Sequence, residues 1–389
     1  MKRQLALLGV ALLVSAGTAA AQANFTWDGG GADTNWTTPE NWVADSSYPG
    51  AVAEDAAYFN DSATGAQTLN LDQDISIDAW YSLVMEDTAG GDYTITTGTG
   101  ASEQTLSVGS NMFNYSTAYD LIIDAPFERT DDNSIYLRPQ ADTTIVFNRS
   151  YRAGQTGQSR IRGAGTLVFN ADTDYSYGLY GGYAAGSGGT TVLGSQNALP
   201  SLSMSNVVET YNVELTTDAE LTGWQNMSIA GGGDPLASTV NVRVREGDTD
   251  RTLTLLNNTV LGTSDPADKF VLDAAGGGGG GAITMKTLYD GITFGKGNIE
   301  IKSGQRLLID TPAEGAGNQY RLWATITGDP DGLIEVMPKS QFLFYDVSGD
   351  SYTAEVDSVM LQLNAAGEDV ATLNMYDFGA GAHNEAIGG

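Results

Sequence analysis

The chain has 389 residues, among them 49 glycines, one histidine and no cysteine, and its 48 acidic and 18 basic residues give a net charge of −30. The lack of cysteine excludes disulfides, thiol catalysis and thiolate metal sites, and the single histidine, His383, excludes His-rich metal centres. Nucleic acids and anionic membranes are poor partners for such a chain, because both require a positive protein surface.

Residues 1–23 predict a secretory signal peptide. Residues 1–3 (MKR) carry the two positive charges of Lys2 and Arg3, and residues 5–14 are apolar. Residues 21–23 (AQA) fit a small-x-small cleavage site. The apolar run is shorter than the roughly 20 residues that cross a bilayer, and we find no later segment that could. We therefore expect an exported protein, at the cell surface or extracellular, without a transmembrane span in the mature chain.

Residues 24–65 form a Trp-rich entry segment. Trp27, Trp36 and Trp42 follow one another closely in this part of the sequence. One interpretation is a sugar-stacking platform, because flat aromatic faces match the C–H face of a pyranose. The other is a hydrophobic plug that caps the end of the fold, since large aromatic side chains bury the most area per residue.

From residue 66 to residue 375 the sequence predicts many short strands. Apolar and polar residues alternate in short segments, and Gly, Asn, Asp or Pro separates nearly all of them. The 33 Asp against 15 Glu, with abundant Gly, Thr, Asn and Ser, are typical of turns and strand edges. The clearest segments are 105–108, 134–138, 144–148, 166–170, 239–246, 251–256, 306–310, 341–347 and 358–363.

The predicted fold class is all-β, as a right-handed parallel β-helix with an aromatic-rich N-terminal cap. Serial β-sandwiches are the alternative, and they would require antiparallel neighbours. At about 20 to 25 residues per coil the chain makes about 15 coils, a rod of roughly 70 to 80 Å. We divide the solenoid into residues 66–275 and 282–375, with the poly-glycine run 276–281 as a loop or hinge. Residues 376–389 are a Gly/Ala-rich tail. A truncated chain, a divergent relative of a surface protein and a freely released protein are the alternatives for it.

Two stretches resemble a known family. Residues 163–170 (GAGTLVFN), followed by 187–192 (SGGTTV) and 197–199 (NAL), are similar to the autotransporter-associated β-strand repeat of exported bacterial proteins. Residues 326–336 (ITGDPDGLIEV) resemble the opening of the same repeat, and residues 25–42 resemble the segment that often precedes it. The resemblance implies a β-helical passenger or stalk at the cell surface.

Paired aspartates suggest calcium as a candidate ligand. Asp72 and Asp74, and likewise Asp248 and Asp250, form Asp-x-Asp turns that could supply part of the six to eight oxygen ligands of Ca²⁺. None of these turns completes a recognised calcium loop, so turn formation is the alternative role. We expect no cofactor, with calcium as the alternative.

Basic residues are unevenly distributed. Residues 24–128 contain 17 acidic residues and no Lys or Arg. Arginines then become frequent, and a basic stripe of Arg149, Arg152, Arg160 and Arg162 could bind an acidic polysaccharide. The alternative is a solvated surface with local ion pairs, each worth at most about 1 kcal/mol.

The resulting functional hypothesis is an exported structural or adhesive protein without catalytic activity. A glycan-binding module is one alternative. The other, a polysaccharide lyase or glycoside hydrolase, rests on fold analogy alone, since the single histidine lies in the Gly/Ala-rich tail and cannot supply a Ser-His-Asp triad. Expected partners are polysaccharides or other cell-surface components, with self-association through open strand edges as a further option.

Overall fold

The computed structural model describes residues 23–377 except a set of short internal stretches. Residues 1–22, to which the signal-peptide prediction refers, and 378–389, most of the predicted tail, lie outside the described residues. So do Arg162 and residues 276–279 of the poly-glycine run. The internal stretches left out are 53, 131–134, 153–158, 162, 175–178, 182–187, 200–201, 206–209, 223–226, 231–238, 257–259, 264–267, 275–279, 289–291, 311–318, 347–354 and 367–368.

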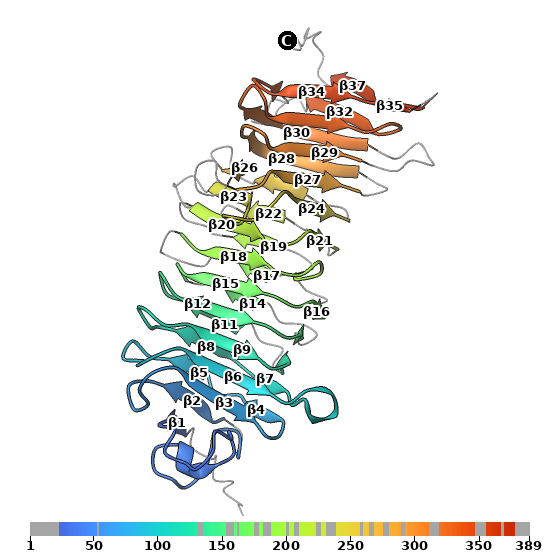
Figure 1. Ribbon diagram of the computed structural model, residues 1–389. Coiled ribbons are helices and arrows are strands. Elements are labelled where there is room, and N and C mark those ends of the chain that lie inside the picture. The colour runs from blue at the N-terminus through green and yellow to red at the C-terminus, as the bar shows by residue number, and fades with distance from the viewer. Residues whose placement is uncertain are drawn as a thin grey trace, which may run out of the picture.

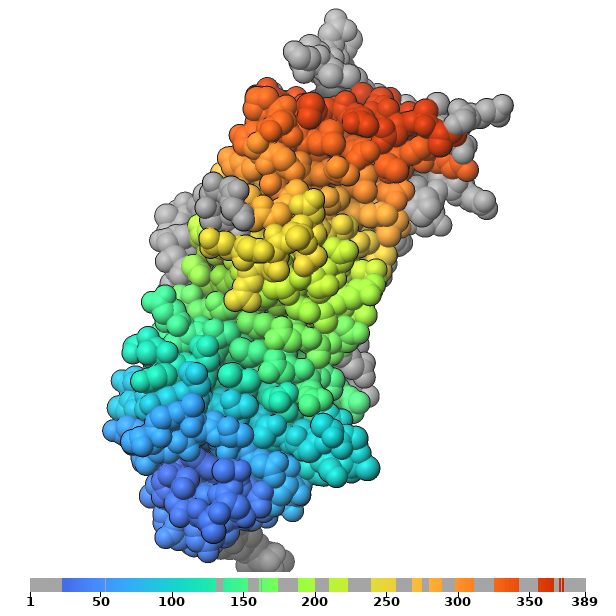
Figure 2. Space-filling model, viewed as in Figure 1, coloured from blue at the N-terminus to red at the C-terminus, as the bar shows by residue number. Residues whose placement is uncertain are grey.

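The described residues form an all-β protein, as predicted. Two single-turn 3₁₀ helices, η1 (Pro39–Asn41) and η2 (Gly100–Ser102), accompany 37 strands. In the described part of the chain, no helix is long and apolar enough to cross a membrane. The strands stack into an elongated body, along which the chain advances steadily from one end to the other (Figures 1 and 2).

Parallel strands pair in three ladders that run along this body. Most coils of the chain contribute in turn to the first, the second and the third ladder, as in β5, β6 and β7 (Figure 1). The first ladder contains β1 (Asn24–Trp27), β2 (Ala56–Phe59), β5 (Tyr81–Met85), β8 (Asn111–Asn114), β11 (Ile135–Pro139), β14 (Ser159–Ile161), β17 (Leu179–Gly181), β19 (Leu202–Ser205), β22 (Met227–Ala230), β25 (Val260–Thr263), β28 (Ile292–Ile301), β30 (Gln319–Gly328), β32 (Gln341–Asp346) and β37 (Thr372–Asp377).

The second ladder lies beside the first, and the long strands β28 and β30 belong to both. It contains β3 (Gln67–Leu71), β6 (Tyr93–Thr97), β9 (Leu121–Asp124), β12 (Thr144–Phe147), β15 (Thr166–Phe169), β18 (Thr190–Leu193), β20 (Thr210–Leu215), β23 (Thr239–Val244), β26 (Lys269–Ala274), β28, β30 and β33 (Glu355–Val356).

The third ladder consists of two sheets. The first sheet contains β4 (Ile75–Ile77), β7 (Leu106–Val108), β10 (Phe127–Arg129), β13 (Tyr151–Arg152) and β16 (Thr173–Asp174). The second contains β21 (Ala219–Leu221), β24 (Arg251–Leu255), β27 (Ile283–Thr287), β29 (Arg306–Ile309), β31 (Leu333–Val336) and β34 (Met360–Leu363). One short pair, β35 (Ala365–Ala366) with β36 (Asp369–Val370), is antiparallel.

The core consists of columns of aligned apolar side chains. Because strands are in register, equivalent inward positions of successive coils lie on top of one another. In the second ladder Phe147 pairs with Phe169, and the two rings stack at 5.2 Å. One complete column is Leu69, Ile95, Ile123, Phe147, Phe169, Leu193, Leu215 and Val244, all of them buried.

Parallel pairing contradicts one of the two predicted architectures and is consistent with the other, a β-helix or solenoid-like fold. Serial β-sandwiches are wrong, since described neighbours within the three ladders are parallel. The ladders continue past the poly-glycine run, because β24 pairs with β27 and β26 pairs with β28 across it. They also begin earlier than predicted, since β1 and β2 lie inside the 24–65 segment and already belong to the first ladder.

Candidate functional site

The three N-terminal tryptophans are buried. Trp27, Trp36 and Trp42 have exposed fractions of 1%, 0% and 0%. Trp42 packs edge-on against both other rings, at 5.2 Å from Trp27 and 5.0 Å from Trp36. The Nε1 atoms of Trp36 and Trp42 donate to the carbonyl oxygens of Pro49 and Trp36 at 2.8 and 2.7 Å. This geometry favours the hydrophobic plug over the sugar platform, because no ring face is free to stack on a ligand.

The aspartates proposed for calcium bind the protein itself. Asp72 accepts hydrogen bonds from the backbone N–H and the hydroxyl of Thr37. Asp74 accepts from the N–H of Thr105 at 2.8 Å, and Asp250 accepts from the N–H of Ala282 at 2.8 Å. Asp248 lies 3.9 Å from the Arg251 guanidinium. These contacts support the turn-forming role.

The two aspartate pairs also belong to distant coils. Asp72 and Asp74 follow β3, whereas Asp248 and Asp250 follow β23, so the pairs cannot share one ion. Among the described residues, no group of three or more His, Asp or Glu side chains is placed to hold a metal.

The predicted basic stripe is divided between faces. Arg149 forms ion pairs with Asp124 at 3.1 Å and with Glu103 at 3.8 Å. Arg152 lies in the third ladder, in register with Glu128 and Asp174 on either side, whereas Arg160 lies in β14 of the first ladder. The stripe prediction for Arg162 lies outside the described residues. Acidic neighbours of Arg149 and Arg152 make this region a poor binding surface for a polyanion.

An aromatic surface that the sequence analysis missed lies on the first ladder. We define it as Tyr58, Tyr81, Tyr115 and Arg138 around the buried Phe113, flanked by Trp80. Tyr81 contacts Phe113 at 5.3 Å, and Phe113 stacks on Tyr115 at 5.1 Å. The Arg138 guanidinium lies 5.6 Å from the centre of the Tyr115 ring. Tyr81, Phe113, Tyr115 and Arg138 therefore form a continuous row across β5, β8 and β11.

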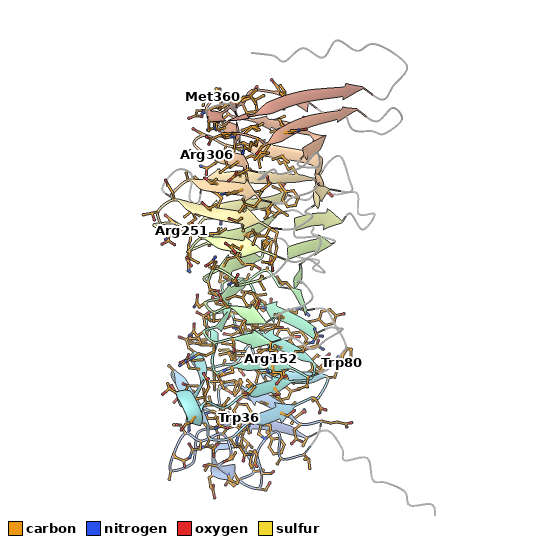
Figure 3. All side chains as sticks on the ribbon, turned by 90° about the vertical axis from the view of Figure 1, so that its right-hand side faces the viewer. Trp36, Trp80, Arg152, Arg251, Arg306 and Met360 are labelled. Carbon is orange, nitrogen blue, oxygen red and sulfur yellow. The ribbon has the colours of Figure 1, made fainter. Side chains whose placement is uncertain are left out.

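Trp80 is the most exposed large apolar side chain described, at 63%, and the adjacent Tyr81 is 43% exposed. Figure 3 shows Trp80 at one margin of the molecule, away from Arg251 and Arg306 on the opposite side. Burial raises the pKa of Tyr58 and of Tyr115, and nearby Glu86 raises that of Tyr58 further. Both phenols therefore stay protonated at neutral pH and can donate hydrogen bonds. Aromatic faces bordered by hydroxyl donors are suited to bind a sugar.

The signal for this surface was present in the sequence but weak. Trp80 and Tyr81 are adjacent, whereas Phe113, Tyr115 and Arg138 come from later coils. Only the coil spacing, which varies along the chain, brings these residues together. The N-terminal cluster of three tryptophans was easier to recognise in the sequence, but these side chains lie in the core.

No family model, curated protein or solved structure matches this chain. Function must therefore be argued from the chain's own surfaces.

Proposed function

We propose that this chain is an exported right-handed β-helical protein of the cell surface or extracellular matrix, with a structural and adhesive role. The observation that supports it is the unbroken stacking of parallel strands from β1 to β37. Fourteen strands of the first ladder, spaced about 4.8 Å apart, make a body roughly 60 Å long. Such a rod presents long lateral faces and holds its two ends apart.

Export is tested by intact mass and fractionation. The full chain, expressed in a bacterial secretion host, should reach the medium or the outer surface, and its mass should show that residues 1–23 have been removed. A variant that lacks these residues should remain inside the cell. An exported protein that keeps them would contradict the predicted cleavage, and retention of the full chain inside the cell would contradict export.

The adhesive role has a specific candidate surface. We infer that the aromatic surface binds a neutral polysaccharide, by stacking of pyranose rings on Tyr81 and Trp80. Aromatic side chains contribute most to binding where they present large rigid faces. The net charge of −30 repels polyanions and also a second copy of the chain, so neither is expected to bind this surface. The mature protein is therefore expected to be retained on an immobilised neutral polysaccharide, and not on alginate.

A further inference from the structure

A polar groove lies on the third ladder, on a different part of the molecule from the aromatic surface. It has a volume of about 530 Å³ and is formed over β21, β24, β27 and β29. This volume falls within the usual range of roughly 300 to 1,000 Å³ for small-ligand sites. Its lining includes Gln196, Glu220, Thr254, Thr284, Lys286 and Arg306.

The groove arises where the two sheets of the third ladder meet. Strand β16 ends one sheet and β21 begins the other, and the coil between them has a turn at Gln196 in this position. The Gln196 carbonyl accepts a hydrogen bond from the Glu220 N–H at 2.7 Å, which fixes the turn against β21. The turn forms one wall, and outward side chains of the sheet form the floor.

The cations of the groove are already neutralised. The Lys286 ammonium lies 2.8 Å from Asp310, and the Arg306 guanidinium lies 3.2 Å from Glu335. An anionic ligand would have to compete with these carboxylates.

Of the acceptors that line the groove, Asp218 accepts a hydrogen bond from the Thr252 N–H at 2.8 Å, whereas the side chains of Glu220 and Thr254 have no such partner in the described part of the chain. Within the described residues, the Glu220 carboxylate has no hydrogen bond or ion pair. Thr254 is only 8% exposed, yet its hydroxyl makes no hydrogen bond there, although it lines the groove. The hydroxyl opens onto the groove and has no protein partner among the described residues, so its donor and its acceptor capacity are both available to a ligand there.

The unused groups specify the chemistry of that ligand. Glu220 is in register with Thr254, and Thr254 with Lys286. Thr284 lies on the same strand as Lys286, two residues from that row, so Glu220, Thr254 and Thr284 span roughly 12 Å. A carboxylate only accepts hydrogen bonds, whereas threonine hydroxyls both donate and accept. The ligand must therefore bring donors, and the negative field of the protein favours a cationic one.

We propose that this groove binds an amino sugar of one or two rings, with its ammonium group on Glu220 and its ring hydroxyls on Thr254 and Thr284. The site is independent of the aromatic surface and of the proposed export. Charge-assisted hydrogen bonds are about twice as strong as neutral ones, so the ammonium contact should dominate affinity.

The experiment uses isothermal titration of the full mature chain with the glucosamine disaccharide and with its di-N-acetylated form, at 0.15 M salt. The cationic form should bind, and acetylation, which removes the charge, should weaken binding about tenfold or more. Glu220→Gln should have the same effect, while Glu246→Gln, an exposed turn acid outside the groove, should leave binding unchanged. Thr254→Val should weaken binding several-fold, and Thr254→Ser should restore it.

Three results would overturn the proposal. The first is equal binding of both sugars, which would make the ammonium group irrelevant. The second is an equal loss in Glu220→Gln and Glu246→Gln, which would indicate attraction by net charge alone. The third is unchanged binding in both Glu220→Gln and Thr254→Val. Unfolding midpoints of all variants show whether a loss reflects the site or the fold, and Thr254→Ser keeps the test open if Thr254→Val unfolds.

Discussion

Truncation of Trp42 should destabilise the N-terminal end of the rod strongly. Its indole is fully buried, contacts Trp27 and Trp36 at 5.2 and 5.0 Å, and donates a hydrogen bond of 2.7 Å to the Trp36 carbonyl. Replacing a buried Trp by Ala costs about 3 to 5 kcal/mol, and the lost hydrogen bond adds about 1 kcal/mol. We expect Trp42→Ala to lose roughly 4 to 6 kcal/mol of unfolding free energy.

The assay is urea denaturation followed by tryptophan fluorescence, together with limited proteolysis. A stacked rod can unfold locally from one end, so proteolysis shows whether residues 24–65 open first. Trp80→Ala is the matched control, since that side chain is 63% exposed and its loss should change stability by less than about 0.5 kcal/mol. A Trp42→Ala variant as stable as this control would refute the plug.

The remaining predictions concern the aromatic surface, the turn aspartates and a buried acid. Trp80→Ala with Tyr81→Ala should lower retention on a neutral polysaccharide column several-fold at an unchanged unfolding midpoint; unchanged retention would exclude this surface as the binding site. Asp250→Ala should cost about 1 kcal/mol in urea denaturation, because the Ala282 N–H loses its acceptor, and Asp250→Asn should cost less. Equal losses in the two would show that charge matters rather than the hydrogen bond. Burial raises the pKa of Asp55, so the folded protein holds this proton more tightly than the unfolded chain, and ionisation above the folded pKa costs stability. Asp55→Asn should therefore raise the thermal midpoint at pH 7, and this gain should disappear near pH 3, where both states of the wild type are protonated. An equal gain at both pH values would contradict this explanation.

Local strand structure was predictable because each strand carries its own alternation. All nine segments singled out from the sequence overlap strands, from β7 (Leu106–Val108) to β34 (Met360–Leu363). Parallel stacking followed from their number and from the lack of linkers. The number of residues per coil was harder to predict, because the loops between strands vary in length. One coil leads from Phe147 to its partner Phe169, whereas a much longer one leads from Ser228 to its partner Gly262. Longer coils give fewer of them, and hence a shorter rod than the sequence led us to expect.

Sites were harder to predict than strands, because sequence proximity does not show which side chains reach solvent. The N-terminal tryptophans are close together in sequence and buried, whereas the aromatic surface combines residues from four coils. The polar groove had no sequence signal, since Glu220, Thr254 and Thr284 come from three successive coils and are ordinary in type. They form a groove only because the strand register brings them together and the turn at Gln196 lies beside them.

The excess of Asp over Glu follows from the spacing of the coils. Many turn aspartates accept a hydrogen bond from a backbone N–H in an adjacent coil, as Asp120 does from Thr144 at 2.7 Å and Asp218 from Thr252 at 2.8 Å. Strands lie about 4.8 Å apart, a gap that the short Asp side chain spans without giving up much rotamer freedom. Described aspartates with such bonds are Asp72, Asp74, Asp78, Asp92, Asp120, Asp172, Asp218, Asp250 and Asp329.

This explanation connects charge with stability in a chain that has no disulfides. A carboxylate bound to a backbone N–H favours its ionised form, and for Asp172 its bonds with Asn197 are the main reason that its pKa is lowered. Asp172 therefore contributes stability above its unfolded pKa, and the contribution is lost as pH falls through the folded value. These nine aspartates therefore join one coil to the next, and their share of the negative charge needs no ligand to explain it.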